Sequence, residues 1–401
     1  MLSQEVAVEI DGRCVLLGDH TYVVKDGGRM PGVVSLHEHS ETQRKPSYFR
    51  GQCWGALGLV VGTLTGCFCL PLELRIHQGF VHLGQTPQTG GTSRTSLGER
   101  VVEMALAFAC AHDRPAWLVL DAFFPTAKVF LLARSVYSIA LQQPYLHVLV
   151  RAKKHYVAYF PAPPKPPHRR GRPPRYGQKI HLWECFDHRH LFDTVYCQVY
   201  GQREAVQVLA LPLLWKPLGD WLLFIFAITS RGPLVLMASD LNLAPTTALE
   251  LYCVRTRIEI MFDVMKNLLH AFCFRFWTPS LPRHPRRPRA NRDLQAPAAA
   301  QVSTVKACWQ AYETFVLCAA IAHGLLQLIA LRFGALVWQH HRLYLRTQSR
   351  ALPSEKTVKQ VLAPRLIQQF IHLPQISILQ KIQHCLDGKD DDDNENDRWV
   401  A

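Results

Sequence analysis

Four side chains on one stretch of the chain have the types and spacing to form a single chemical site. Tyr252, Arg255, Glu259 and Lys266 lie at offsets of 0, 3, 7 and 14 residues. At about 100° per helical residue, these offsets place all four within a sector of roughly 60°. The shared face would present a carboxylate, two cations and a phenol. The alternative is a solvated face with ion pairs four residues apart, which gives no reason for the tyrosine.

A helix must position these side chains, and the sequence predicts one over residues 245–272. Pro245 suits the first helical turn, where the N–H that proline lacks would have no partner in the helix. Apolar side chains lie on the side of the helix opposite Glu259 and would pack on a core: Val254, Ile258, Met261, Met265 and Leu268. One face of the helix is therefore expected to be buried while the other carries the chemistry.

Two aspartates upstream each stand in an apolar run. Asp19 follows the apolar residues 15–17 and is expected in the middle of a buried strand, and Asp121 follows residues 117–120 and is expected near the C-terminal end of another. A buried carboxylate without a partner is costly, and proteins retain one where it binds a metal or has a fixed partner. Either aspartate alone could be a strand-end residue that faces solvent. The two together, followed by Glu259 on a helix, favour a metal site.

The elements around these residues alternate between strand and helix patterns. A helix is predicted over residues 96–111, because Ser96 can cap it and Glu99 completes a capping box. Strands are predicted at 54–61 and 146–151, and a second helix at 127–141. Several β-like runs come next, at 196–200, 205–209, 221–228 and 234–237. They predict a β-rich insertion before the helix that carries Glu259.

The spacing of Tyr252, Arg255, Glu259 and Lys266 resembles the YREK signature of insertion-sequence DDE transposases. Other parts of the chain are similar to further blocks of that family: Asp19, His20 and Thr21 with Gly28, Arg29, Met30, Pro31 and Gly32; residues 117–124; Ser239, Asp240 and Leu241; and Arg275, Phe276 and Trp277. The resemblance extends from about residue 11 to residue 340.

The resemblance implies an α/β fold like that of ribonuclease H, with a β-rich insertion between the second aspartate and the glutamate. It implies that Asp19, Asp121 and Glu259 are catalytic and hold two Mg²⁺ ions, for which Mn²⁺ can substitute. Hard oxygen ligands suit Mg²⁺, and two ions can activate the attacking oxygen and stabilise the leaving one at phosphorus. The implied function is cut-and-paste DNA transposition, with water and then the freed DNA 3′-hydroxyl as nucleophile.

The same resemblance implies that Tyr252, Arg255 and Lys266 contact phosphates near the transposon end, since Arg and Lys both bind phosphate. It also implies an aromatic residue in the insertion that stacks on a flipped base. Trp215, next to Lys216, is our candidate for that residue, with packing in the core as the alternative.

A basic loop offers a further DNA contact. Arg170 and Arg172 belong to an Arg-Gly-Arg-Pro stretch that resembles an AT-hook core, and such a stretch can lie in a narrow minor groove. The alternative is a flexible basic loop without that specificity.

The composition agrees with a folded protein that binds a polyanion. Hydrophobic residues make up 48% and charged residues 19% of the 401 residues, and the net charge is +14; this favours nucleic acid or an anionic membrane as partner. Residues 315–338 are long enough to span a bilayer, but His323, Gln327 and Arg332 would be costly in lipid. We therefore expect no membrane partner.

The cysteines also bear on the class of protein. Twelve cysteines without a CxxC pair make a zinc site an unfavoured interpretation and suggest free thiols in a reducing compartment. No signal peptide is visible at the N-terminus. These observations, together with the resemblance, predict a cytoplasmic, nucleoid-associated bacterial protein.

The expected domains follow the composition. Residues 1–153 and 239–281 would form the two parts of the core, and 154–238 the insertion with its basic loop. A Pro/Arg linker is expected at 282–300, a helical region at 301–386 and an acidic disordered tail at 387–401. The resemblance further implies a homodimer on DNA.

Two alternatives remain open at this point. Members of the family carry a helical DNA-recognition region before the first aspartate block, whereas here that aspartate is already residue 19. Either the start is internal or the region has been lost, so one alternative is a truncated, inactive remnant that only binds DNA. The other is a different ribonuclease H-like nuclease, such as a resolvase.

Overall fold

The computed structural model describes residues 6–37, 48–84, 95–139, 142–164, 174–284, 294–342, 351–372 and 380. The chain divides into two compact units. The first comprises residues 1–262 and 271–317, and the second comprises residues 263–270 and 318–401. Each unit is described by itself.

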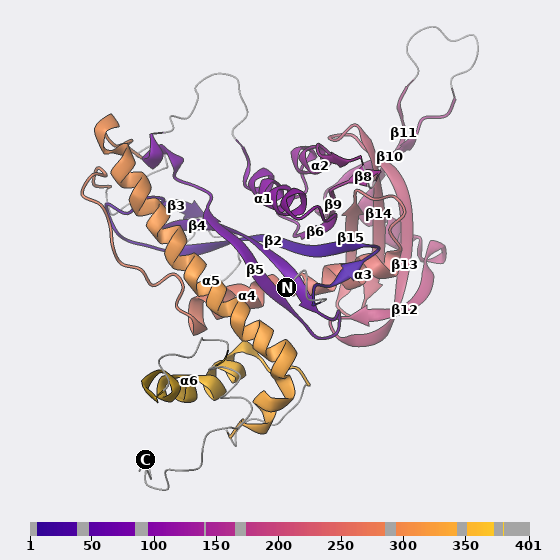
Figure 1. Cartoon of the computed structure of the whole chain (residues 1–401). Coiled ribbons are helices and arrows are strands. Elements are labelled where there is room, and N and C mark those ends of the chain that lie inside the picture. Colours follow the sequence, from indigo (N-terminus) through magenta and orange to yellow (C-terminus); the bar gives the residue numbers. More distant parts are fainter. Residues whose placement is uncertain are drawn as a thin grey trace. The chain divides into compact units, whose positions relative to one another are not determined.

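One large mixed sheet dominates the first unit (Figure 1). Its main path runs β11 (Tyr176–His181), β10 (Val157–Pro161), β13 (Gln202–Trp215), β14 (Asp220–Thr229), β15 (Gly232–Ala238), β9 (Leu146–Arg151), β6 (Ala116–Leu120), β2 (Arg13–Val24), β4 (Tyr48–Gly62) and β3 (Val34–His37). Three strands pair beside this path: β1 (Glu9–Ile10) with β2, β12 (Asp193–Val199) with β13, and β5 (Cys67–Ile76) with β4. A separate hairpin joins β7 (Tyr137–Ser138) to β8 (Gln143–Pro144).

The parallel strands at the centre of the sheet place the two aspartates beside each other. β6 pairs in parallel with β2 and with β9, and every residue of β6 is buried. The last β2–β6 partners are Leu17 and Val119. Asp19 and Asp121 are each two residues further along the chain. Parallel pairing therefore brings them to the same height along the two neighbouring strands.

Two helices pack together near β6 and β9 in Figure 1. α1 (Leu97–Ala111) begins with the predicted capping box, because the Ser96 and Glu99 side chains each accept the other residue's backbone N–H. α2 (Ala127–Ala133) is shorter than the helix predicted over 127–141. Short 3₁₀ turns complete the irregular parts: η2 (Phe80–Leu83), η3 (Leu182–Asp187), η4 (Arg189–Leu191) and η7 (Ala299–Gln301).

The predicted β-like runs correspond to β12, β13, β14 and β15, although the run 196–200 extends one residue past the end of β12. β14 forms long antiparallel ladders with β13 and β15. β15 in turn pairs antiparallel with β9. These strands therefore continue the central sheet instead of forming a sheet of their own.

The helix predicted over 245–272 is not continuous. It consists of α3 (Pro245–Val254), a turn at Arg255, α4 (Thr256–Asp263) and the π-helical segment η5 (Val264–Leu268). The Arg255 N–H bonds to the Tyr252 carbonyl at 3.1 Å, and the Ile258 N–H bonds to the Arg255 carbonyl at 3.1 Å. These three-residue steps tighten the backbone locally, and the expected buried face is still observed at Val254, Ile258, Met261 and Met265.

The second unit contains the C-terminal part of α5 (Val302–Gln339) and α6 (Glu355–His372). α5 is the one described helix that is long and apolar enough to cross a membrane, judged by length and composition alone. His323 and Gln327 on α5 are fully buried, and both bond to Glu355 at the start of α6. This polar cluster ties the two helices together within the protein.

Candidate active site

Three acidic side chains from separate elements surround one arginine. Asp19 lies in β2, Asp121 directly follows β6, and Glu259 lies on α4. Arg255, in the turn before α4, is the central residue and its side chain is only 9% exposed. The carboxylates become progressively more accessible, at 18% for Asp19, 39% for Asp121 and 58% for Glu259.

The Arg255 guanidinium contacts all three carboxylates. Its Nη2 atom lies 2.7 Å from Asp19 Oδ2 and 3.5 Å from Asp121 Oδ2. Its Nη1 atom lies 2.6 Å from Glu259 Oε1. Because one planar group spans them, the contacting oxygens of Asp19 and Glu259 are at most about 8 Å apart. The three carboxylates predicted from the sequence are therefore brought together.

The carboxylates are spread around the arginine and do not converge on one point. Among the residues that the structure describes, no three His, Cys, Asp or Glu side chains are close enough to form a ready-made metal cluster. The described cysteines are free thiols. The positive charge that the acidic side chains require is supplied here by Arg255.

Burial controls the charge state of this site. Burial, with smaller contributions from the Asp121 and Glu259 carboxylates, raises the pKa of Asp19 from its ordinary 3.8 to about 6. Arg255 and the His20 backbone N–H oppose that rise. Burial alone would lower the pKa of Arg255, but the carboxylates outweigh it and raise this pKa, so the guanidinium stays charged.

Tyr252 orients the second aspartate. The residue is 8% exposed, and its hydroxyl donates to Asp121 Oδ1 at 3.4 Å. Burial, followed by the Asp121 charge, raises the pKa of the phenol, so the hydroxyl remains a donor at neutral pH. Tyr252 therefore contacts a carboxylate within the protein, a contact that the helical spacing alone did not predict.

Three carboxylates around a buried positive charge fit a divalent cation chemically. Their oxygens are the hard ligands that Mg²⁺ prefers, and the site already holds a positive charge between them. The raised pKa of Asp19 shows that the burial of this carboxylate is incompletely compensated. The donor chemistry of these residues therefore suits a divalent ion, which would have to displace Arg255 from its contacts with the carboxylates.

The candidate stacking residue lies in the core. Trp215 is 3% exposed, and its ring packs near Phe130 and Tyr156 at centroid distances of 5.8 and 5.7 Å. This placement agrees with the core-packing alternative. Lys216, the next residue, is exposed in the turn between β13 and β14.

The remaining predicted DNA contacts are not part of the carboxylate cluster. Lys266 lies in η5, which belongs to the second unit. Arg170 and Arg172 lie outside the described residues.

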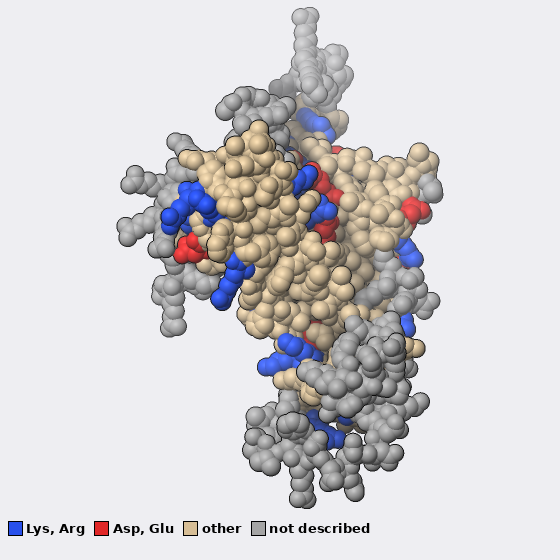
Figure 2. Space-filling model, turned by 60° about the vertical axis from the view of Figure 1, so that its left-hand side comes forward, with Lys and Arg blue, Asp and Glu red and all other residues tan. Residues whose placement is uncertain are grey.

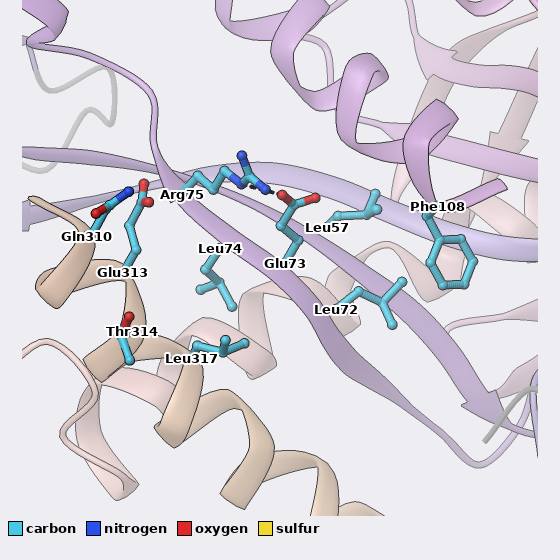
Figure 3. A pocket seen from close by; sticks show the side chains of 10 residues that line it. All are labelled: Leu57, Leu72, Glu73, Leu74, Arg75, Phe108, Gln310, Glu313, Thr314 and Leu317. Atoms are coloured by element: carbon cyan, nitrogen blue, oxygen red, sulfur yellow. Dashed lines mark ion pairs between the residues drawn. The ribbon is translucent and has the colours of Figure 1, made fainter. Parts of the chain in front are cut away.

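A cavity of about 740 Å³ elsewhere in the first unit contains none of the predicted site residues (Figure 3). Leu72, Glu73 and Arg75 of β5 line it on one side, and Glu313 and Leu317 of α5 line it on the other. Glu73 pairs with Arg75 across its wall. In the face seen in Figure 2, described acidic and basic side chains gather together near the middle, without a broad field of one sign.

Comparison with known proteins identifies the family. The sequence model described as DDE superfamily endonuclease matches residues 1–208, which include Asp19 and Asp121. No curated protein matches the chain. Since the matched region covers more than half of the chain, the protein belongs to the DDE superfamily endonucleases.

Proposed function

We propose that this protein is a DDE transposase of the YREK subgroup, which cleaves transposon ends and joins them to target DNA. One observation carries the proposal: Arg255 contacts Asp19, Asp121 and Glu259 where β6 ends beside β2. A DDE endonuclease acts on DNA phosphodiesters through such carboxylates. Glu259 lies beyond the region that the family shares, so its role depends on the geometry and the YREK-like spacing.

Asp19, Asp121 and Glu259 would hold two Mg²⁺ ions, with Mn²⁺ as a substitute. When bound, such ions lower the energy of in-line displacement by polarising the attacking and leaving oxygens. The chain's own residues prepare the site for them. The His20 backbone N–H holds one oxygen of Asp19 at 2.8 Å, and the Tyr252 hydroxyl holds one oxygen of Asp121.

Arg255 has two roles in this proposal. Without ions its single positive charge offsets part of the repulsion among the three carboxylates that it contacts. With ions and DNA present, the guanidinium would exchange carboxylate contacts for a phosphate oxygen, which planar arginine binds well. Lys266, Lys216, Arg170 and Arg172 would contribute further phosphate contacts.

The surrounding architecture supports a ribonuclease H-like arrangement. β2, β6 and β9 form a parallel core, and β4 pairs antiparallel to β2. We propose residues 1–153 and 239–281 as the two parts of that core, with the β-rich segment 154–238 inserted between them. The working form would be a homodimer bound to DNA inside a bacterial cell.

A second candidate function is a DNA-binding remnant without activity. The observation that favours it is that Arg255 already contacts all three carboxylates, in the position between them that a metal would need. The two functions differ in whether DNA is cut.

Nicking of supercoiled plasmid in Mg²⁺ or Mn²⁺ tests this difference. The expected result is nicking by the wild type that EDTA abolishes and that Asp121→Ala and Glu259→Gln both lose. Asp220→Asn is the matched control, because this half-exposed carboxylate pairs with Arg134 away from the cluster. Plasmid binding without nicking by the wild type would favour the remnant.

A further inference from the structure

Two histidines near the carboxylate cluster, His20 and His77, form a hydrogen bond that joins β2 to the end of β5 across β4. His20 follows Asp19 in β2, and His77 follows the end of β5. Their rings meet with His20 Nε2 2.9 Å from His77 Nδ1. β4 lies between these two strands, so the His77 ring has to pass over β4 to reach its partner.

Gly55 makes that crossing possible. It is the β4 residue directly opposite His20 in the ladder. A Cβ atom built on Gly55 would lie 2.0 Å from His77 Cε1, far inside van der Waals contact. The ring therefore occupies the space that any other side chain at position 55 would need.

The other side of His20 connects to the second aspartate. Its ring stacks on Phe124 with a centroid distance of 5.4 Å and an interplanar angle of 22°. Phe124 is 2% exposed, and its backbone N–H bonds to the Asp121 carbonyl at 3.0 Å. A continuous set of contacts thus runs from β5 through the strand of Asp19 to the turn of Asp121.

The pair is uncharged at neutral pH. Burial lowers the pKa of His20 to about 3 and, with the neighbouring His20, Arg100 and Arg75, that of His77 to about 2. One imidazole donates and the other accepts, so the link adds no positive charge beside the carboxylates. This is a packing and hydrogen-bonding link, and its effect is geometric.

We propose that His20, His77 and Phe124 are positioning residues that fix Asp19 and Asp121 relative to each other for cation binding. The inference rests on the proposed function, since it assigns these aspartates to a divalent ion. Outer groups that orient metal ligands typically change metal affinity by about 10–100-fold when removed. Neither histidine touches the ion in this proposal, and each acts through backbone and ring contacts.

Calorimetric titration of the full chain with Mn²⁺ tests the proposal. His77→Ala is expected to weaken Mn²⁺ binding by about 10-fold. His77→Asn should restore most of the affinity, because an asparagine side chain can place a polar atom near the position of Nδ1. His147→Ala is the matched control: His147 is also buried in the sheet, but it bonds to Ser239 and packs on Trp117.

Unfolding midpoints measured in EDTA separate positioning from stability. His77→Ala and His147→Ala should both lower the midpoint, whereas only His77→Ala should lose Mn²⁺ affinity. If His77→Ala does not fold, Phe124→Leu carries the test, since it removes the ring that stacks on His20. Wild-type affinity in the folded variants would overturn this inference alone, and the absence of Mn²⁺ binding by the wild type would overturn the proposed function.

Discussion

The Arg255 guanidinium lies 2.7 Å from the Asp19 carboxylate and occupies the centre of the candidate active site. This contact joins the strand of the first aspartate to the turn that precedes the glutamate helix. It explains how a mostly buried aspartate can remain next to two other carboxylates. It also means that the positive charge needed by the site is present before any metal arrives.

Replacing Arg255 with alanine should destabilise the metal-free protein. Breaking a buried ion pair by removing one partner costs about 3 kcal/mol or more, because three carboxylates lose their shared cation. Urea unfolding in EDTA measures the change. Arg114→Ala is the control, because Arg114 pairs with Glu9 at the surface, and such pairs contribute about 1 kcal/mol or less.

Divalent ions should rescue the same variant. Mg²⁺ can supply the charge that Arg255→Ala lacks, so the variant should gain more stability from Mg²⁺ than the wild type does. The absence of any Mg²⁺-dependent gain in either protein would argue against a cation site between these carboxylates.

The raised pKa of Asp19 predicts a specific dependence on pH. The folded state keeps the proton up to about pH 6, whereas the unfolded chain releases it near the ordinary value of 3.8. The folded state therefore binds more protons between these values, and this contribution to stability falls as pH rises from about 4 to about 6. To isolate this contribution, the free energy of unfolding is measured against pH in EDTA for the wild type and for Asp19→Asn, and the second curve is subtracted from the first. Parallel curves for the two proteins would contradict the raised pKa.

Mn²⁺ affinity should change in the opposite direction over the same window. The ion binds the ionised carboxylate, so affinity should rise with pH up to about 6 and then level off. Calorimetric titrations at several pH values measure this. An affinity that is constant below pH 6 would exclude Asp19 as a ligand.

Tyr252→Phe should affect catalysis more than stability. The hydroxyl donates to Asp121 over 3.4 Å, which is a long bond, so its loss should cost about 1 kcal/mol or less. Nicking should fall several-fold because Asp121 is less well oriented. Tyr145→Phe removes another tyrosine–aspartate bond, to Asp113, and should leave nicking unchanged. An equal loss in both variants would point to a general effect.

Trp215 and Lys216 should separate stability from DNA binding. Trp215→Ala should lower the free energy of unfolding by about 3–5 kcal/mol, because the Trp215 ring packs in the core against Phe130. Lys216→Ala should leave stability within about 0.5 kcal/mol and reduce DNA affinity, with a salt slope lower by about 1. Chemical unfolding and filter binding at several salt concentrations measure both. A stable Trp215→Ala protein with impaired DNA binding would instead assign Trp215 to the DNA surface.

Local chemistry explains why part of the fold could be predicted from the sequence. The capping box at Ser96 and Glu99 is a short-range pattern, and it marks the start of α1 correctly. The apolar runs before Asp19 and Asp121 likewise form buried strands. These signals depend on neighbours in sequence, so no tertiary information was needed to find them.

The contacts that depend on tertiary structure were not predictable. Helical spacing gave no sign of the turn at Arg255, which divides the expected helix and directs the guanidinium toward the carboxylates. His20 stood in a motif block, but His77 is 57 residues away and follows a different strand. Gly55 was the available signal, since a glycine in an apolar strand can mark a close approach. The sequence does not show that the ring that approaches Gly55 belongs to His77.

Iron-directed cleavage of the protein backbone can show whether Asp19, Asp121 and Glu259 bind a metal together. Fe²⁺ bound in place of Mg²⁺ produces radicals with ascorbate and peroxide, and these cut the chain next to the metal. We expect cuts near all three residues that excess Mg²⁺ suppresses. The combined variant Asp19→Asn, Asp121→Asn and Glu259→Gln should lose these cuts. Cuts at other positions only, or cuts at these positions that persist in the variant, would contradict a metal site built from the three carboxylates.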